Sequence, residues 1–233
     1  MGIRKKTSPK LRGRVRKILL APFALLGVYF GAVILFLLLL NITSPPTTGV
    51  QIQRRIEALV SQSPYEKQYR PVRGNQISPH LRHAVVAAED GRFYEHFGID
   101  WEALREAAEE NRRRGRRRRG GSTITQQLGK NLFMTTHSTY VRKALEVPVS
   151  FLAEILLSKE RLLTVYLNVI EWGDGIYGAE AAARHYYGKS AADLTRREAA
   201  SLAAILPSPR TRSPQHMGRY ASTILARMAQ MGW

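Results

Sequence analysis

The sequence contains no cysteine and comparatively few acidic residues. Without cysteine the chain has no disulfide, and no thiolate can act as a nucleophile or metal ligand. Its 18 Asp and Glu stand against 36 Lys and Arg, so the formal net charge is +18. Internal repeats are absent, and so is the alternation of polar and apolar residues that is typical of strands. These absences exclude a disulfide-stapled or repeat protein and favour an all-α fold.

The positive charge is concentrated in two short stretches. Eight Lys or Arg and no acid lie in residues 1–17, and seven Arg lie in residues 112–119. Subtracting these 15 charges from +18 leaves only +3 for the rest of the chain. Such a charge often indicates a nucleic-acid partner. Basic patches beside an apolar segment indicate a membrane surface first, so we expect no nucleic-acid partner.

Residues 18–40 form a run of 23 residues without a charge. As a helix the run would reach roughly 34 Å, enough to cross the hydrocarbon core of a bilayer. It is longer than the apolar part of a secretory signal, and no Ala-x-Ala pattern follows it. A buried core helix is the alternative, but such helices are usually shorter. The basic residues before the run predict a cytoplasmic N-terminus and an exported remainder.

This anchor divides the chain into four parts. We expect a basic cytoplasmic tail (1–17), a transmembrane helix (18–40), a linker (41–50) and a helical domain (51–233) with a flexible Arg-rich loop at about 112–120. The first domain helix, 51–62, places Ile52, Ile56, Leu59 and Val60 on one face. Residues 65–76 look like an irregular connection, and residues 171–175 look like a turn-rich loop.

A helix that begins at Ser78 is predicted to end with two acids. Ser78 is a good N-cap and Pro79 suits the first helical position. Glu89 and Asp90 fall at the C-terminal end, where the helix dipole disfavours acids by a few tenths to about 1 kcal/mol. The same field raises the pKa of a carboxyl group and makes it a better base near neutral pH. We expect a functional site here; the alternative is that Glu89 pairs with a basic neighbour.

Residues 120–131 combine glycine, hydroxyl and amide groups and include a lysine at position 130. A helix that begins near Thr123 needs one cap. Gln126, Gln127 and Lys130 are too many polar groups for that purpose alone, which favours a polar cleft.

The helix expected at 140–157 carries Arg142 and Glu146 on one face, because they are four residues apart. An ordinary surface ion pair is the alternative. Pro148 removes one backbone hydrogen bond and crowds the carbonyl of Ala144. It therefore predicts a kink or a break beside Glu146.

Four segments, in order, resemble the motifs of the peptidoglycan glycosyltransferases, glycosyltransferase family 51. The segments are Glu89-Asp90-x-x-Phe93-x-x-His96-x-Gly98-Ile99-Asp100, Gly121-Ser122-Thr123-Ile124-Thr125-Gln126-Gln127-x-x-Lys130-Asn131, Arg142-Lys143-x-x-Glu146 and Tyr166-Leu167-Asn168. The resemblance runs from about Gln76 to Pro209 and is specific because four motifs occur in order. The short length and single anchor are similar to the monofunctional members. The Ser-x-x-Lys and Lys-Thr-Gly motifs of penicillin-binding transpeptidase domains are absent.

The resemblance implies a lysozyme-like helical domain with a smaller, membrane-dipping jaw. It implies polymerisation of lipid II, in which the acceptor's GlcNAc 4-hydroxyl attacks the anomeric carbon of a lipid-linked MurNAc. The configuration inverts and undecaprenyl pyrophosphate leaves. Lipid II, the nascent glycan strand and the membrane are the implied partners, together with transpeptidases and divisome or elongation proteins. The implied location is the bacterial inner membrane, with a periplasmic catalytic domain.

The resemblance also implies roles for individual residues. Glu89 is the base, and Glu146 is a second essential acid that assists pyrophosphate departure directly or through a metal. Lys130 and Arg142 bind the pyrophosphate. The other implied substrate-binding residues are Asp90, Phe93, His96, Ser122, Thr123, Gln127, Asn131 and Lys143. No cofactor is strictly required and no residue is assigned to a metal, although Mg²⁺ or Mn²⁺ at the pyrophosphate is compatible with the reaction.

The chain departs from the family at one position. Members commonly have Glu-Arg a few residues before the Arg142-Lys143 pair, and that arginine helps to hold phosphate, whereas this chain has His137-Ser138. Pyrophosphate binding would then depend more on Lys130, Arg142, Lys143 or the Arg-rich loop. Two other functions remain open. One is a membrane-anchored lysozyme-like hydrolase, and the other is a basic, non-enzymatic adaptor that binds anionic lipid.

Overall fold

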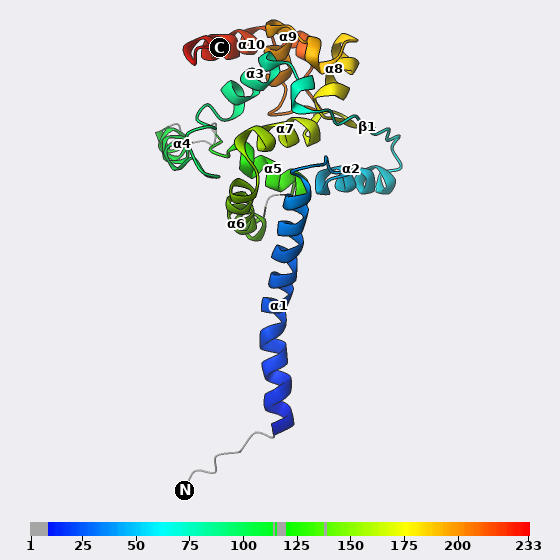
Figure 1. The fold of residues 1–233 in the computed structure, drawn as a ribbon, viewed down its shortest axis with the longest axis vertical. Helices are drawn as coiled ribbons and strands as arrows, with labels where there is room; N and C mark the ends of the chain where they lie inside the picture. Colours follow the sequence, from blue (N-terminus) through cyan, green and yellow to red (C-terminus); the bar gives the residue numbers. More distant parts are fainter. Residues whose placement is uncertain (1–8, 114, 116–119, 138) are drawn as a thin grey trace.

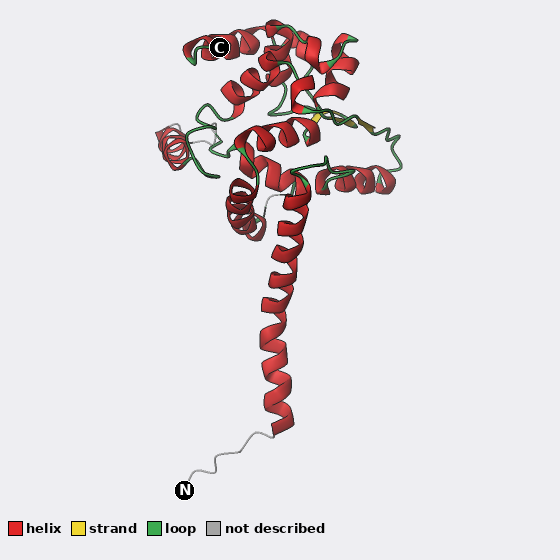
Figure 2. Ribbon diagram, viewed as in Figure 1, coloured by secondary structure: helices red, strands yellow, loops and turns green. Residues whose placement is uncertain are grey.

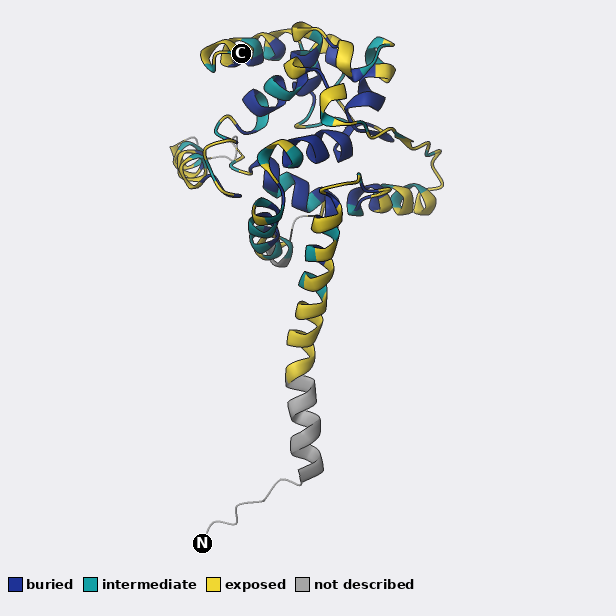
Figure 3. Cartoon of the chain, viewed as in Figure 1, coloured by how far each residue is buried: buried dark blue, intermediate teal, exposed yellow. Residues whose placement is uncertain are grey.

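The computed structural model describes residues 9–113, 115, 120–137 and 139–233 and shows a helical domain at the end of one long helix (Figures 1 and 2). Helix α1, Pro9–Leu39, begins within the basic tail, nine residues before the start that its apolar run predicted. Its segment Leu20–Leu39 is the one helix in the described part that is long and apolar enough to cross a membrane. Figure 3 shows this segment largely exposed, as expected of a helix that meets lipid rather than protein.

The domain is built mainly from helices, so the all-α prediction is confirmed. The helices are α2 (Gly49–Val60), α3 (Pro79–Glu89), α4 (Trp101–Arg113), α5 (Ile124–Phe133), α6 (Tyr140–Leu156), α7 (Lys159–Val169), α8 (Ala179–Tyr187), α9 (Arg196–Ala203) and α10 (Gly218–Gln230). The predicted caps at Ser78 and Thr123 are confirmed, because each side chain accepts a hydrogen bond from the first turn of its helix. Most of the Arg-rich loop, residues 114 and 116–119, and Ser138 lie outside the described residues.

The structure contains a small sheet that the sequence did not predict. Strands β1 (Gln68–Tyr69), β2 (Glu171–Gly173) and β3 (Ile176–Tyr177) form it in the order β1-β3-β2. β1 is parallel to β3 and β2 is antiparallel to it, so residues 171–177 make a hairpin where we expected only turns. Strands of two or three residues are too short to show an alternating pattern in the sequence.

The helices pack as two groups that meet at α7. One group contains α3, α9 and α10, which contact one another, and the other joins α5 to α6, α7 and α2, with α1 against α6 (Figure 1). In α7, every residue from Leu162 to Val169 is buried, which makes this helix the centre of the core. Glu89, at the end of α3, accepts a hydrogen bond from Gln127 of α5, so it lies where the first group faces the second.

Helix α6 continues without interruption through Pro148, so the predicted break is wrong. Proline removes one of many backbone hydrogen bonds in a helix of 17 residues. Leu145, before Pro148, packs partly buried against the core, and Val149, after it, is fully buried, so both halves are held in place. A kink at this position stays a prediction.

The apolar face of α2 is exposed instead of buried. Ile52, Ile56, Leu59 and Val60 are between 49 % and 80 % exposed, so they do not form part of the core. In Figure 1, α2 starts beside the domain end of α1, where the apolar helix stops, and runs sideways from it. A large exposed apolar stripe at this level is typical of a surface that meets a membrane.

Candidate active site

A cleft of about 820 Å³ runs along the end of α3. Its lining includes five of the predicted site residues: Glu89, Asp90, Ser122, Thr123 and Gln127. Another part of the wall comes from α10 and its C-cap, which contribute Tyr220, Arg227, Gln230 and Met231. The cleft has the size and the mixed polar and apolar lining expected of a ligand site.

Glu89 is the last residue of α3 and lies in the wall of this cleft. Burial raises the pKa of its carboxyl group, and the hydrogen bond from Gln127 and the charge of Lys130 act in the opposite direction. The predicted direction is therefore confirmed, but burial rather than the helix terminus is the main cause. In the described part of the chain, Glu89 accepts from an amide and forms no ion pair, so the alternative of a simple salt bridge fails.

A chain of hydrogen bonds fixes the position of the Glu89 carboxylate. Gln127 Nε2 donates to Glu89 at 2.9 Å, and the Tyr166 hydroxyl donates to Gln127 Oε1 at 2.8 Å. Tyr166 is fully buried and its pKa is raised well above the ordinary value by burial, so the hydroxyl keeps its proton. The resulting orientation of Gln127 presents its N–H group to the acid.

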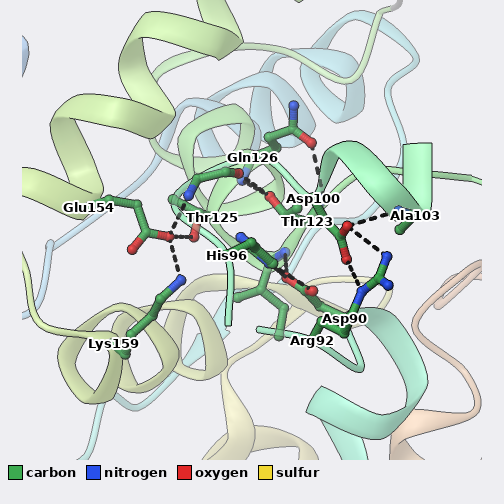
Figure 4. A network of polar contacts seen from close by, with 12 residues as sticks. Asp90, Arg92, His96, Asp100, Ala103, Thr123, Thr125, Gln126, Glu154 and Lys159 are labelled. Carbon is green, nitrogen blue, oxygen red and sulfur yellow. Dashed lines mark hydrogen bonds and ion pairs between the residues drawn. The ribbon is translucent and has the colours of Figure 1, made fainter. Parts of the chain in front are cut away.

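Three residues of the first motif, Asp90, Phe93 and His96, support the structure of the site. Figure 4 shows Asp90 and His96. Asp90 is buried, caps the end of α3, accepts from the Ile124 backbone at 2.9 Å and contacts His96 Nε2 at 3.0 Å. The other ring nitrogen of His96 is buried without a partner in the described residues. Phe93 is fully buried, with the Lys159 ammonium 4.5 Å from its ring centre. Phe93 and His96 therefore do not line the cleft, and only Asp90 of the three reaches it.

The second motif divides into residues that face the cleft and residues that build it. Ser122 is exposed in the cleft wall. Thr123 also borders the cleft, but its hydroxyl donates to the Gly98 carbonyl at 2.6 Å and caps α5. Asn131 is buried and donates to the Gln127 carbonyl at 2.8 Å, so it supports the turn that carries Gln127. The sequence predicted all three as ligands, but Ser122 alone has a side chain that is free to meet one.

Lys130 lies close enough to Glu89 of the cleft and to Arg142 and Glu146 of the third motif to feel their charges. Burial lowers the pKa of its ammonium, as does the nearby charge of Arg142, while Glu146, Glu89 and Glu171 oppose the shift. Lys130 therefore lies within electrostatic reach of both predicted catalytic acids. A cation with a lowered pKa gains from an incoming anion, because the anion favours the charged form.

Arg142 and Glu146 form an ion pair on one face of α6, as their spacing predicted. Both side chains are largely buried, at 13 % and 11 % exposed, so this is not an ordinary surface pair. Lys143 is exposed and points to the other side of the same turn. The structure brings Lys130, Arg142 and Glu146 together and leaves Lys143 at the periphery.

A buried carboxylate that the sequence did not reveal supports the site. Glu154 of α6 accepts from the Gly98 backbone at 3.1 Å, the Thr125 hydroxyl at 2.7 Å and the Lys159 ammonium at 2.8 Å (Figure 4). These bonds tie the segment between α3 and α4 to three helices. A single acid within the apolar stretch 149–157 was the available signal, because charges are seldom buried without a partner.

The described residues contain no group of three or more His, Asp or Glu that would hold a metal by itself. Glu146 is already bound by Arg142, and the charge of Lys130 lies within reach of both Glu146 and Glu89. These residues fit an anion better than a metal cage. A Mg²⁺ or Mn²⁺ ion would need oxygen ligands from the anion itself.

The sequence is similar to known proteins over most of its length. The sequence model of the family described as Transglycosylase matches residues 55–230. A protein named biosynthetic peptidoglycan transglycosylase from Dechloromonas aromatica is 51 % identical over 157 residues, which cover 66 % of this chain and 68 % of that protein. Proteins of the same name are 43 % identical in Nitrosospira multiformis (79 % and 82 % covered) and 42 % identical in Pseudomonas fluorescens Pf-5 (90 % and 88 % covered).

Proposed function

The chain belongs to the transglycosylase family and is a peptidoglycan glycosyltransferase, and on that premise we propose that it polymerises lipid II into linear β-1,4 glycan strands. The proposed reaction inverts the configuration at C1 of the donor MurNAc and releases undecaprenyl pyrophosphate. One observation carries this proposal: a partly buried carboxylate of raised pKa, Glu89, lies in a cleft within electrostatic reach of Lys130.

Glu89 supplies the base for the first half of the reaction. Its carboxylate takes the proton of the acceptor 4-hydroxyl while that oxygen forms a bond to C1 of the donor MurNAc. A raised pKa makes the carboxylate a stronger proton acceptor at neutral pH. Gln127 keeps the carboxylate oriented through the bond that Tyr166 fixes from the other side.

The cations of α5 and α6 stabilise the leaving group. As the bond between C1 and the pyrophosphate oxygen breaks, its electron pair passes to the pyrophosphate, whose charge Lys130 and Arg142 stabilise. A guanidinium can bind two phosphate oxygens at once. Glu146 holds the Arg142 guanidinium in place from the same helix face. If Mg²⁺ or Mn²⁺ takes part, its oxygen ligands would come mainly from the pyrophosphate, with Glu146 as the protein acid beside it.

The location and partners follow from the same premise. The apolar helix α1 anchors the chain, and the basic residues before it favour a cytoplasmic N-terminus with the catalytic domain on the periplasmic side of the inner membrane. Transpeptidases and divisome or elongation proteins are the protein partners that we expect, because new glycan strands must be cross-linked and placed.

The decisive experiment is polymerisation of lipid II in detergent by the wild type and by Glu89→Gln. The wild type should convert lipid II into strands, and the variant should lose at least about a hundredfold in rate, the usual effect of removing a general base. Glu95→Gln is the matched control, because Glu95 is an exposed acid six residues away. Equal rates for wild type and Glu89→Gln would overturn the assignment. Release of lipid-free sugar by water would favour the hydrolase instead.

A further inference from the structure

A second cavity, of about 450 Å³, lies on α2 outside the catalytic cleft. It is a groove between α2 and the start of the connection that joins α5 to α6. Its lining residues are Gly49, Ile52, Gln53, Ile56, Glu57, Val60, Thr135 and His137. Ile52, Ile56 and Val60 are exposed apolar side chains, so the groove presents hydrocarbon to the outside. Its volume is in the range of pockets that bind small ligands.

Hydrogen bonds join the groove to the connection between α5 and α6, the helices that carry Lys130 and Arg142. Gln53 donates to the Thr136 hydroxyl at 2.7 Å and accepts from the Thr136 backbone at 2.7 Å. The connection leaves α5 just after Lys130 and enters α6 just before Arg142. The groove wall and the two cations are therefore parts of one continuous segment.

Two further contacts fix α2 in this position. A Cβ at Gly49 would lie 2.6 Å from the Met134 carbonyl oxygen, so glycine allows the start of α2 to touch the end of α5. Arg54 binds Glu171 of β2 through both Nε and Nη2, at 3.1–3.3 Å. The groove is thus joined by direct contacts to the end of α5, the helix that carries Lys130.

We propose that this groove binds the first isoprene units of the polyprenyl chain of the substrate, directly beyond the pyrophosphate. The inference rests on the proposed use of a lipid-linked pyrophosphate. That lipid is attached to the pyrophosphate covalently, so it must leave the site of Lys130 and Arg142 along an apolar path. The groove is an apolar path that begins on the connection between them, and α2 starts beside the domain end of the apolar helix α1 and runs sideways from it (Figure 1).

A groove that binds the lipid differs from a face that merely touches the membrane. Leu59 belongs to the same exposed stripe of α2 and is 70 % exposed, but it does not line the groove. Tryptophan at either position keeps the face apolar and favours membrane contact. Only tryptophan at position 56 fills the groove. Ile56→Trp and Leu59→Trp therefore form a matched pair that separates the two functions.

The test measures inhibition of strand synthesis from lipid II in detergent by two probes. Geranylgeranyl pyrophosphate has four isoprene units, and inorganic pyrophosphate has none. Ile56→Trp should weaken inhibition by geranylgeranyl pyrophosphate about tenfold, and Leu59→Trp should leave it within about twofold. Inorganic pyrophosphate should inhibit both variants as it inhibits the wild type, which also shows that the pyrophosphate site is intact.

Three results would overturn the groove. In the first, inhibition by geranylgeranyl pyrophosphate weakens equally in the two variants. In the second, this inhibition does not weaken in Ile56→Trp. In the third, Ile56→Trp loses inhibition by inorganic pyrophosphate to the same extent as inhibition by geranylgeranyl pyrophosphate. The first would mean that α2 only contacts bulk lipid or detergent. A wild type that fails to polymerise lipid II would instead contradict the proposed function, so the two failures are distinguishable.

Discussion

The side-chain amide of Gln127 donates a 2.9 Å hydrogen bond to the carboxylate of Glu89. The amide cannot turn over freely, because its oxygen accepts from Tyr166 at 2.8 Å. Burial raises the pKa of Glu89, and this hydrogen bond limits the rise because it favours the charged form. Burial thus raises the proton affinity of the proposed base, and two residues from α5 and α7 limit the increase.

Replacement of Gln127 by methionine should move the acid limb of the pH–rate profile upward. The rate constant kcat/KM increases with pH as Glu89 loses its proton, and loss of the amide donor raises the Glu89 pKa further. The midpoint of that limb should therefore move to higher pH. Tyr166→Phe should move the midpoint to higher pH by a smaller amount, because the Gln127 amide remains but loses the hydrogen bond that orients it. A midpoint that stays fixed in Gln127→Met would contradict the role of this bond.

Glu89→Gln should stabilise the fold at neutral pH while it abolishes activity. The folded state prefers the protonated acid, because burial raises its pKa above that of the unfolded chain. Between the unfolded and folded pKa values the folded state binds more protons, so stability falls as pH rises through that window. The gain in Tm for Glu89→Gln should be largest at neutral pH and disappear near pH 4. A gain that does not depend on pH would show that the carboxylate is not destabilising.

The sequence predicts the helices and the motif residues well because both depend on local chemistry. Ser78 and Thr123 cap their helices, and Arg142 meets Glu146, since these relationships span three or four residues. The raised pKa of Glu89 was also predictable in direction. Its cause was not, because burial depends on which helices cover the end of α3.

The relationships that the sequence could not predict are long-range. Phe93 and His96 belong to a motif but support the fold from inside it, and a motif does not distinguish support from contact. Gln53 meets Thr136 over a separation of 83 residues, and Glu154 meets Gly98 over 56. The sequence correctly placed the apolar stripe of α2 on one face. It could not show that the stripe is exposed, because exposure depends on whether another helix covers that face.

Arg142 and Lys143 are adjacent basic residues that should differ greatly in importance. Arg142 is largely buried and held by Glu146, whereas Lys143 is exposed. Arg142→Gln should lower kcat/KM for lipid II at least about tenfold, because it removes a cation from a site of low dielectric. Lys143→Gln should change it less than about threefold, since an exposed charge is screened by salt. Steady-state kinetics at 0.15 M salt distinguishes the two, and equal losses would place Lys143 in the site as well.

The remaining prediction concerns Glu154, which is 3 % exposed and bound to Lys159. Glu154→Ala leaves a largely buried ammonium without its partner and frees the Gly98 and Thr125 donors. Removal of one member of a buried pair typically costs about 3 kcal/mol or more, so the midpoint of urea unfolding should fall markedly.

The double variant Glu154→Leu, Lys159→Met is the control for this prediction, because it removes both charges and keeps the volume. It should recover most of the loss, since a buried ion pair and an apolar pair are often nearly equal in stability. Activity should not recover to the same extent. The apolar pair cannot hold the Gly98 backbone, and Thr123, at the start of α5, is anchored to Gly98 by its hydroxyl. If activity returned together with stability, Glu154 would serve the fold alone and not the position of the cleft wall.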